Sequence, residues 1–548
     1  MASIVPLRSS RTMRVRIAES MAIFTVFSVL YLALAVLLVF GLQLVLGDAW
    51  TRVGNASHAL LSRDPHLAAI GFVWNPLPSL LTFPLLLFAQ LWPSLLREGF
   101  AANIVSAVAM AFALVQIDGL LVDWGIVRWG RLALIGAVAL NPLIAFYGAN
   151  GMSEALFLAA VLYTVRHLAC WLDGREVGQL VRVGIGVATA YLIRYEAGAA
   201  AIAVIAIVAV ASWSRARSGE RGAAAQADAI IVGMPFATVF ALWAAASWVF
   251  VGSPFETFTS VYGNSSQIAL ISQWISLKTG QGTSAAPAFL ATQVLALGPA
   301  LLILPFVAIA LIRAKVPTPA LAAAPLGAVL AFAAWAFLSG RSFGWLRFEI
   351  MAIPLAMIVA VGAGALAMRA FSGGRTSSLA IGSLVIILAW SGIPTTTWVM
   401  LDPLLAQEES RQLAPYVAAA AGAPFLRPPD SQIYVLGGEL AELVDGLHAP
   451  RGSVLVDAAT SYPLVLRSQR PQQFVIPSDR DFRAALANPG LFGLRYFVVA
   501  LDQGIGIVDA INRAHTGAYD NGGGVGRLVG EVSAPGLGWR VYEVVEPE

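Results

Sequence analysis

The sequence contains very little cysteine and little charge. Cys170 is the single cysteine among 548 residues, which excludes an intramolecular disulfide and a metal site built from several cysteines. Only 12% of the residues are charged and 58% are hydrophobic, whereas a soluble protein of ordinary composition carries about 25% charge. The formal net charge of +3 is too small to suggest a nucleic-acid partner. The composition therefore predicts a polytopic membrane protein.

The N-terminal segment predicts a retained first span. Arg8, Arg11, Arg14 and Arg16 precede an apolar run over 21–46, which is too long for the apolar region of about 7 to 15 residues in a cleavable signal peptide. Basic residues before a span favour a cytoplasmic N-terminus. Arginine is also much commoner than lysine, and alanine is abundant, as is typical of GC-rich bacterial genomes. We therefore expect a protein of the bacterial inner (plasma) membrane.

Further apolar runs bring the prediction to about 11 spans. They lie at 100–122, 132–147, 155–172, 183–193, 197–213, 229–251, 288–312, 317–338, 350–368 and 378–398. With these spans, about 16 basic residues lie inside and about 7 outside, as the positive-inside rule requires. The short run at 183–193 covers roughly 17 Å of a hydrocarbon core of about 30 Å. Arg194 should therefore lie below the outer surface, in a water-filled pocket.

Two other regions are predicted to lie outside. Residues 47–98 form the first exterior loop, in which the proline-containing run 77–96 should lie along the membrane interface. Residues 402–548 lack long apolar runs and read as an exterior soluble α/β domain. The strands expected there are at 431–438, 452–459, 472–478, 494–501 and 538–546, with helical patterns at 479–487 and 506–514. The fold class is thus mainly α, with membrane spans over 1–401 and a C-terminal α/β domain.

Charged residues from distant segments converge on the outer ends of the predicted spans. They are Asp48, Arg52, Asp64, His66, Glu154, Arg194, Glu196, Arg341, Arg347 and Glu349. A carboxylate near several arginines can act as a general base toward a hydroxyl. Arginines beside the membrane can bind a lipid-attached phosphate and stabilise the charge that develops when it departs. This convergence predicts a working site at the outer border of the membrane.

Several motifs resemble the GT-C class of integral-membrane glycosyltransferases over about residues 15–400. They are Asp48 directly after the first span, WNPLPSLL at 74–81, NPLIAFYGANGMSEALF at 141–157, LIRYEAG at 192–198 and RFEIMAIPLAMI at 347–358. The layout is similar to that of bacterial relatives of protein O-mannosyltransferases and aminoarabinose transferases. The resemblance implies a polyprenyl-phosphate-linked sugar donor, inverting transfer at the outer face, and Asp48 as the general base. The acceptor would be a glycan, a lipid or a protein of the cell envelope.

The resemblance also suggests roles for the other candidates. Asp48 and Glu154 are the expected catalytic residues, and Arg52, Asp64, His66, Arg194, Glu196 and Arg347 are expected to bind substrate. Many relatives carry two adjacent acids, whereas Ala49 follows Asp48. This leaves open whether Asp64 or Glu154 supplies a second carboxylate, and whether a divalent metal ion binds at Asp48.

Structural roles remain as alternatives. Asp48 or Glu154 could cap a helix, and Arg194 or Arg347 could form a structural ion pair with Glu196 or Glu349. His66 could be an ordinary loop residue, because no second histidine lies at metal-ligand spacing. At the level of function, charged residues at span ends also suit a transporter or flippase of a lipid-linked or anionic solute. A third alternative is a membrane scaffold that displays the C-terminal domain.

Overall fold

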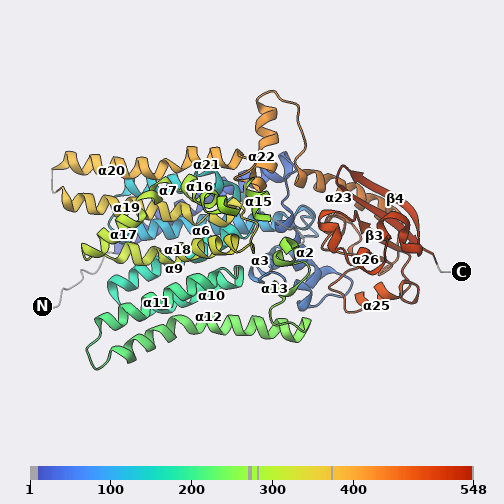
Figure 1. The fold of residues 1–548 in the computed structure, drawn as a ribbon, viewed down its shortest axis with the longest axis horizontal. Helices are drawn as coiled ribbons and strands as arrows, with labels where there is room; N and C mark the ends of the chain where they lie inside the picture. The colour runs from blue at the N-terminus through green and yellow to red at the C-terminus, as the bar shows by residue number, and fades with distance from the viewer. Residues whose placement is uncertain (1–9, 270–273, 281–282, 372–373, 546–548) are drawn as a thin grey trace.

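The computed structural model describes residues 10–269, 274–280, 283–371 and 374–545, so Arg8 lies outside the described residues. The molecule is elongated, with a bundle of long helices at one end and the α/β domain at the other (Figure 1). We call the end of the bundle next to this domain the domain-side end. The prediction of a mainly helical membrane protein with a C-terminal α/β domain is confirmed.

Within the described residues, eight helices are long and apolar enough to cross a membrane. They are Arg16–Gly41 (α1 with η1), Phe100–Asp123 (α6), Glu154–Gly174 (α9), Ala197–Arg215 (α11), Arg221–Val251 (α12), Thr318–Leu338 (α18), Leu346–Ala370 (η5 with α19) and Thr376–Leu401 (α20 with α21). The chain is therefore an integral membrane protein.

Two further runs form bent helix pairs. Arg128–Ala139 (α7) meets Pro142–Ala149 (α8) at 68°, and Ala286–Leu297 (α16) meets Pro299–Arg313 (η4 with α17) at 114°. Each second helix begins at a proline, which cannot donate the backbone hydrogen bond that would continue the first helix. Counting each pair as one span gives up to ten spans in the described chain, fewer than the 11 expected.

The remaining expected span is the helix before Arg194. It is α10 (Val177–Ile193), which has 17 residues and begins earlier than the predicted run at 183–193. Arg182 lies within it and is exposed, because a long arginine side chain can extend toward water from inside a helix. Arg194 follows the last helical residue, as expected from the sequence.

Short helices occupy the chain between α1 and α6. They are α2 (Gly47–Leu61), η2 (Leu67–Ile70), α3 (Leu77–Leu80), α4 (Phe83–Leu86) and α5 (Ser94–Arg97). Pro78 and Pro84 stand in the first turns of α3 and α4, where the missing N–H does no harm. Prolines thus divide the apolar run 77–96 into pieces too short to span a membrane.

The C-terminal domain is built on a five-stranded mixed sheet in the order β2-β1-β3-β5-β4. β1 (Val454–Val456), β2 (Phe474–Val475) and β3 (Tyr496–Ala500) are parallel, whereas β4 (Gly526–Ala534) and β5 (Leu537–Val544) are antiparallel. The helices of this region are α22 (Gln407–Ala420), α23 (Pro429–Gly446), α24 (Tyr462–Arg467), α25 (Phe482–Ala487), α26 (Ala510–Ala514) and α27 (Ala518–Asn521).

Four of the five predicted strands and both helical patterns are confirmed, and one strand is wrong. Residues 431–438 lie inside α23, because Gly437, Leu440, Ala441 and Val444 are buried at helical spacing. β4 was not predicted, since its residues are mostly exposed and carry little apolar pattern.

Candidate active site

Asp48 lies in the first turn of α2, seven residues after the α1 span ends at Gly41. Its Oδ2 accepts a hydrogen bond from Arg347 Nη2 at 3.1 Å. The residue that caps α2 is Leu46, so Asp48 does not act as the helix cap. Its side chain is 39% exposed, which leaves the carboxylate accessible to a ligand.

Arg347 is surrounded by carboxylates at the start of the α19 span. It lies in η5 (Leu346–Glu349) and its side chain is only 3% exposed. Besides Asp48, its guanidinium contacts Glu408 Oε1 at 3.2 Å and Glu154 Oε1 at 3.6 Å. Breaking a buried ion pair by removing one partner leaves an uncompensated charge. These contacts therefore fix α2, α9 and α22 around one guanidinium.

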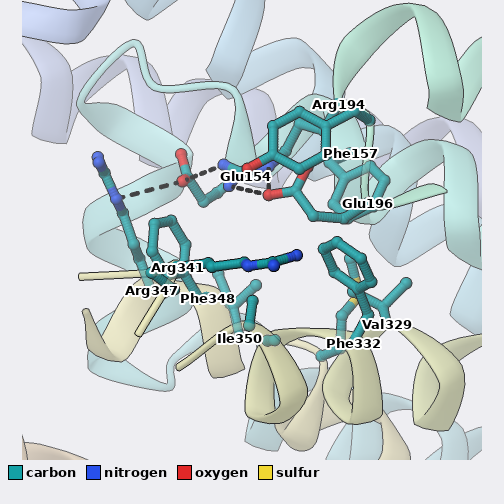
Figure 2. A pocket seen from close by; sticks show the side chains of 15 residues that line it. Glu154, Phe157, Arg194, Glu196, Val329, Phe332, Arg341, Arg347, Phe348 and Ile350 are labelled. Atoms are coloured by element: carbon teal, nitrogen blue, oxygen red, sulfur yellow. Dashed lines mark hydrogen bonds and ion pairs between the residues drawn. The ribbon is translucent and has the colours of Figure 1, made fainter. Parts of the chain in front are cut away.

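Glu154 connects Arg347 to a second arginine. It stands in the first turn of α9 and its side chain is 2% exposed. Arg194 Nη1 donates to Glu154 Oε1 at 2.6 Å, and Arg194 Nη2 donates to Glu196 Oε1 at 2.7 Å. Figure 2 shows this row from Arg347 through Glu154 and Arg194 to Glu196. We call the six connected residues the charged cluster: Asp48, Glu154, Arg194, Glu196, Arg347 and Glu408.

A pocket lies against the charged cluster. Its polar lining includes Glu154, Arg194, Glu196, Arg341 and Arg347, and its apolar lining includes Phe157, Phe332 and Phe348. Arg341 extends into this pocket (Figure 2). In the part of the chain that the structure describes, Arg341 has no carboxylate partner. Its guanidinium carbon lies 5.6 Å from the centroid of the Trp335 ring.

Asp48 is not among the residues that line this pocket. It approaches Arg347 from α2, whereas the pocket borders Arg347 together with Arg194 and Arg341. Arg347 therefore contacts an accessible carboxylate and also borders a pocket whose Arg341 has no carboxylate partner in the described part of the chain. A molecule that reaches from the pocket past Arg347 would contact both.

Arg52 lies one turn beyond Asp48 on α2, beside the Trp74 ring at 5.0 Å. Its Nη1 is buried and has no hydrogen-bond partner among the described residues. Burial alone would raise the pKa of the Asp48 carboxyl, but the charges of Arg347 and Arg52 outweigh burial and hold this pKa below its ordinary value. Asp48 is therefore ionised at neutral pH.

Glu408 has the opposite protonation preference. Its carboxyl is largely removed from water, and the neighbouring charges of Glu409, Asp48 and Glu154 oppose a further negative charge. These effects raise the pKa of Glu408 well above its ordinary value, even though Arg347 acts in the other direction. The pKa values of two carboxyl groups on one guanidinium are thus shifted in opposite directions.

Sequence reasoning missed Glu408 and its surroundings. Glu409 is fully buried and accepts a hydrogen bond from the Tyr147 hydroxyl at 2.8 Å. Lys278, also buried, donates to Gln407 Oε1 at 3.3 Å, and burial lowers its pKa to about 8. The signal in the sequence was the adjacent acid pair Glu408-Glu409 directly after the last span, at the start of a helix.

Asp64 and His66 are predicted to bind substrate, and the structure places them apart from the charged cluster. Asp64 Oδ2 accepts a hydrogen bond from the Arg480 backbone at 3.1 Å, and His66 Nδ1 contacts the Asp64 carbonyl at 2.7 Å. Arg63 next to them forms ion pairs with Asp479 and Asp481. These residues join α2 to the C-terminal domain, and their contacts explain why the sequence gives this loop so many charges.

Glu349 does not form the structural ion pair that the sequence suggested as an alternative. It is 3% exposed and forms no ion pair within the described residues, so it is not the partner of Arg347. Arg194 does pair with Glu196, as the structural alternative held, but it pairs with Glu154 as well.

The C-terminal domain covers α2 beside Asp48. Trp50 packs against Tyr434 of α23 and Tyr462 of α24, with ring centroids 5.7 and 5.6 Å apart. The Tyr462 hydroxyl would lie 2.8 Å from a Cβ atom at Gly47, so this close approach favours glycine just before Asp48. Burial, together with the charge of Asp48, raises the pKa of Asp430 in α23 to about 7.

A metal ion does not fit the charged cluster as it stands. Among the described residues, no group of three or more His, Cys, Asp or Glu side chains could hold one. Asp48, Glu154 and Glu408 each place an oxygen on Arg347, and a guanidinium already occupies the position where their charges meet. We therefore assign no step to a metal ion.

No protein-family model and no curated protein matches this sequence. Among solved structures, the chain is similar to an oligosaccharyltransferase from Archaeoglobus fulgidus tethered to an acceptor peptide, with a TM-score of 0.44 and 11% identity over 88% of this chain and 69% of that one. It is also similar to the oligosaccharyltransferase AglB from the same organism in complex with an inhibitory peptide and a dolichol-phosphate, with a TM-score of 0.43 and 10% identity over 95% and 74% of the two chains. At such identities, the roles of residues in this chain have to be argued from its own contacts.

Proposed function

We propose that this protein is a GT-C-like membrane glycosyltransferase that moves a sugar from a polyprenyl-phosphate donor to a glycan, lipid or protein acceptor. One observation carries the proposal: Arg347 contacts the accessible carboxylate of Asp48 and also lines a pocket in which Arg341 has no carboxylate partner among the described residues. A candidate base and a candidate anion site therefore both border one guanidinium, at the domain-side end of the membrane spans.

The anion site suits a lipid-linked phosphate. Arg341 lines the pocket and has no carboxylate partner among the described residues, so its guanidinium can bind phosphate oxygens, and hydrogen bonds between two ions are the strongest kind. Phe157, Phe332 and Phe348 give the same pocket an apolar wall, which suits the first isoprene units next to the phosphate. A phosphate joined to a membrane-embedded chain would reach this site without leaving the bilayer surface.

The transfer itself would be a single displacement. The acceptor hydroxyl oxygen attacks the anomeric carbon of the sugar, and the bond from that carbon to the phosphate oxygen breaks. The electron pair leaves with the polyprenyl phosphate, whose added charge is stabilised by the arginines, and the hydroxyl proton passes to Asp48. A carboxylate with a lowered pKa suffices, because the hydroxyl proton becomes strongly acidic as the new bond forms. One displacement inverts the anomeric configuration.

Glu408 would keep the site from becoming too negative. Arg347 and Arg194 contact four carboxylates in the charged cluster, an arrangement that would repel a phosphate if all four were ionised. Because the pKa of Glu408 is raised, we take Glu408 as protonated when the donor binds. Asp48 is then the ionised carboxylate closest to solvent.

We further propose that the domain-side end faces the exterior. The loops at the opposite end are rich in basic residues, which favour the cytoplasmic side. They include Arg128, Arg175, Arg215, Arg217, Arg221, Arg313, Lys315 and Arg369. The α/β domain, packed over α2 beside Asp48, would then meet acceptors of the cell envelope.

The test is sugar transfer by the purified protein in nanodiscs. Polyprenyl-phosphate donors carrying different radiolabelled sugars are incubated with the protein and with envelope extracts as acceptor, and the products are separated by charge. The proposal expects loss of label from the lipid and appearance of free polyprenyl phosphate. Movement of intact donor between leaflets of proteoliposomes without cleavage would instead establish the transporter or flippase alternative.

A further inference from the structure

An uncharged arm projects from the molecule just beyond the membrane spans. It comprises residues 413–426, which form the second half of α22 and the chain that follows it, and it lies between Arg411 and Arg427. None of its side chains is charged. In Figure 1, α22 crosses the direction of the bundle helices and extends sideways past them at the domain-side end. We call this segment the apolar arm.

Hydrogen bonds fix the level of the arm relative to the membrane. The Tyr416 hydroxyl donates to the Leu42 carbonyl oxygen at 2.7 Å, and Arg427 Nη1 donates to Gln43 Oε1 at 2.9 Å. Leu42 directly follows the first span, which ends at Gly41. The arm therefore leaves and rejoins the protein at the level where α1 emerges from the bilayer.

The arm exposes apolar side chains that nothing in the described chain covers. Val417 is 51% exposed, Phe425 is 48% exposed and Leu426 is 73% exposed, and the Phe425 ring lies tilted against the Tyr416 ring with centroids 5.3 Å apart. The chain reverses at Gly422, which has a φ of 92° that favours glycine. A Cβ at Gly422 would meet no other atom within 4 Å, so no other part of the described chain packs against this position.

Lipid accounts for these features together. Long apolar segments at the membrane border, flanked by basic residues, lie in the interface with their apolar side chains among the acyl chains. A soluble domain seldom leaves such a segment in water, because exposed apolar side chains lose the free energy that burial provides. The arm is bound to the residues that follow the first span. The bilayer can therefore cover its apolar side chains, and no second protein is needed.

We propose that the apolar arm inserts into the headgroup and acyl boundary of the leaflet on the domain side and anchors α22 to the membrane. The first turn of α22 carries Glu408, which contacts Arg347, so the anchor also fixes this part of the charged cluster relative to the bilayer surface. The insertion does not depend on the proposed function, since it follows from the level and composition of the arm alone.

The single native cysteine makes a direct test feasible. A Cys170→Ser background keeps a hydroxyl near Asp123 Oδ2, which Cys170 Sγ contacts at 3.4 Å. A nitroxide spin label is then placed at Leu426→Cys or, as a second arm site on the helix, at Val417→Cys. Two exposed leucines are matched controls: Leu379 on the α20 span, 64% exposed, and Leu491 on the C-terminal domain, 85% exposed.

The readout is the accessibility of each label to oxygen and to a water-soluble nickel chelate, in vesicles of phosphatidylcholine and phosphatidylglycerol. The proposal expects both arm sites to favour oxygen over the chelate severalfold, like Leu379→Cys, while Leu491→Cys favours the chelate. Arm sites that behave like Leu491→Cys would lie in water and overturn the proposal. Arm sites inaccessible to both reagents would be covered by protein, which would overturn it equally.

Discussion

The Arg347 guanidinium and the Asp48 carboxylate lie 3.1 Å apart, although 299 positions separate them in the sequence. The contact joins the first helix after the first span to the first turn of a span near the end of the membrane region. Glu154 and Glu408 contact the same guanidinium from two further helices. Four segments thus meet at one buried cation, and the predictions below follow from this meeting point.

Replacing Arg341 should weaken donor binding more than turnover. Arg341→Ala removes a pocket cation without a carboxylate partner, and hydrogen bonds to charged groups contribute about 1.5 to 3 kcal/mol. We expect KM for the polyprenyl-phosphate donor to rise about tenfold or more, with kcat changed less. Arg480→Ala is the matched control, because Arg480 is an exposed partner of Asp64. Equal KM values for the wild type and Arg341→Ala would refute phosphate binding by Arg341.

Neutralising Glu154 should destabilise the fold. Glu154→Gln leaves Arg194 and Arg347 without the buried carboxylate that contacts both, and breaking a buried pair in this way costs about 3 kcal/mol or more. The melting temperature, followed by tryptophan fluorescence in nanodiscs, should therefore fall by several degrees. Glu531→Gln, which breaks an ion pair between Glu531 of β4 and Arg540 of β5, should change the melting temperature little. An unchanged melting temperature for Glu154→Gln would show that the bridge does not stabilise the protein.

The protonation of Glu408 should appear in the pH dependence of transfer. Because its pKa is raised, Glu408 stays protonated to a higher pH than an ordinary glutamate and gains a negative charge as the pH rises. That charge competes with the donor phosphate for Arg347, so wild-type activity should fall at alkaline pH. Glu408→Gln cannot ionise and should lose this fall, while Glu439→Gln, at an exposed position on α23, should keep it. The same alkaline fall in Glu408→Gln and the wild type would exclude Glu408 as its source.

A buried carboxyl pair in the C-terminal domain should make stability depend on pH. Burial and the charge of Asp457 raise the pKa of Asp509 to about 7, from about 3.9 in an unfolded chain. Between these values the folded state binds more protons, so stability should be highest below about pH 4 on this account and should fall as the pH rises to 7. Asp457 has a raised pKa as well, and it also accepts a hydrogen bond from the Tyr262 hydroxyl at 2.9 Å.

Asp509→Asn removes one of these two protons and keeps an oxygen to cap α26, whose Ile511 and Asn512 amides donate to Asp509. The decrease in melting temperature between pH 5 and pH 8 should therefore be smaller in this variant than in the wild type. Asp502→Asn, at an exposed position nearby, should leave the decrease unchanged. A full decrease in Asp509→Asn would contradict the assignment.

Much of the fold could be predicted because it depends on local patterns. Long apolar runs predict the membrane helices, and short apolar runs of strand length predict β1, β2, β3 and β5. The bends in α7–α8 and α16–α17 were missed because hydrophobicity alone does not separate a straight span from two helices broken at a proline. Residues 431–438 were misread because a short apolar run fits a strand and a buried helix face equally well.

Residues of the candidate site could be predicted only where they lie at the end of a span, because a span end indicates the depth of a residue relative to the membrane. Asp48, Glu154, Arg194 and Arg347 follow or begin long apolar helices, and ion pairs now join them. Asp64 has the same residue type and a similar position in the sequence as Asp48, yet it turns to Arg480 of the C-terminal domain. Which partner a loop carboxylate meets depends on how the domain packs over α2, and a pattern along one chain does not contain this information.

The most direct test of the central claim compares Asp48→Asn with Asp64→Asn in single-turnover transfer of radiolabelled sugar from a polyprenyl-phosphate donor. If Asp48 is the base, Asp48→Asn should slow the transfer step by about 10² to 10⁴-fold, with donor binding retained, and Asp64→Asn should react at nearly the wild-type rate. Equal single-turnover rates for Asp48→Asn and the wild type would contradict the account.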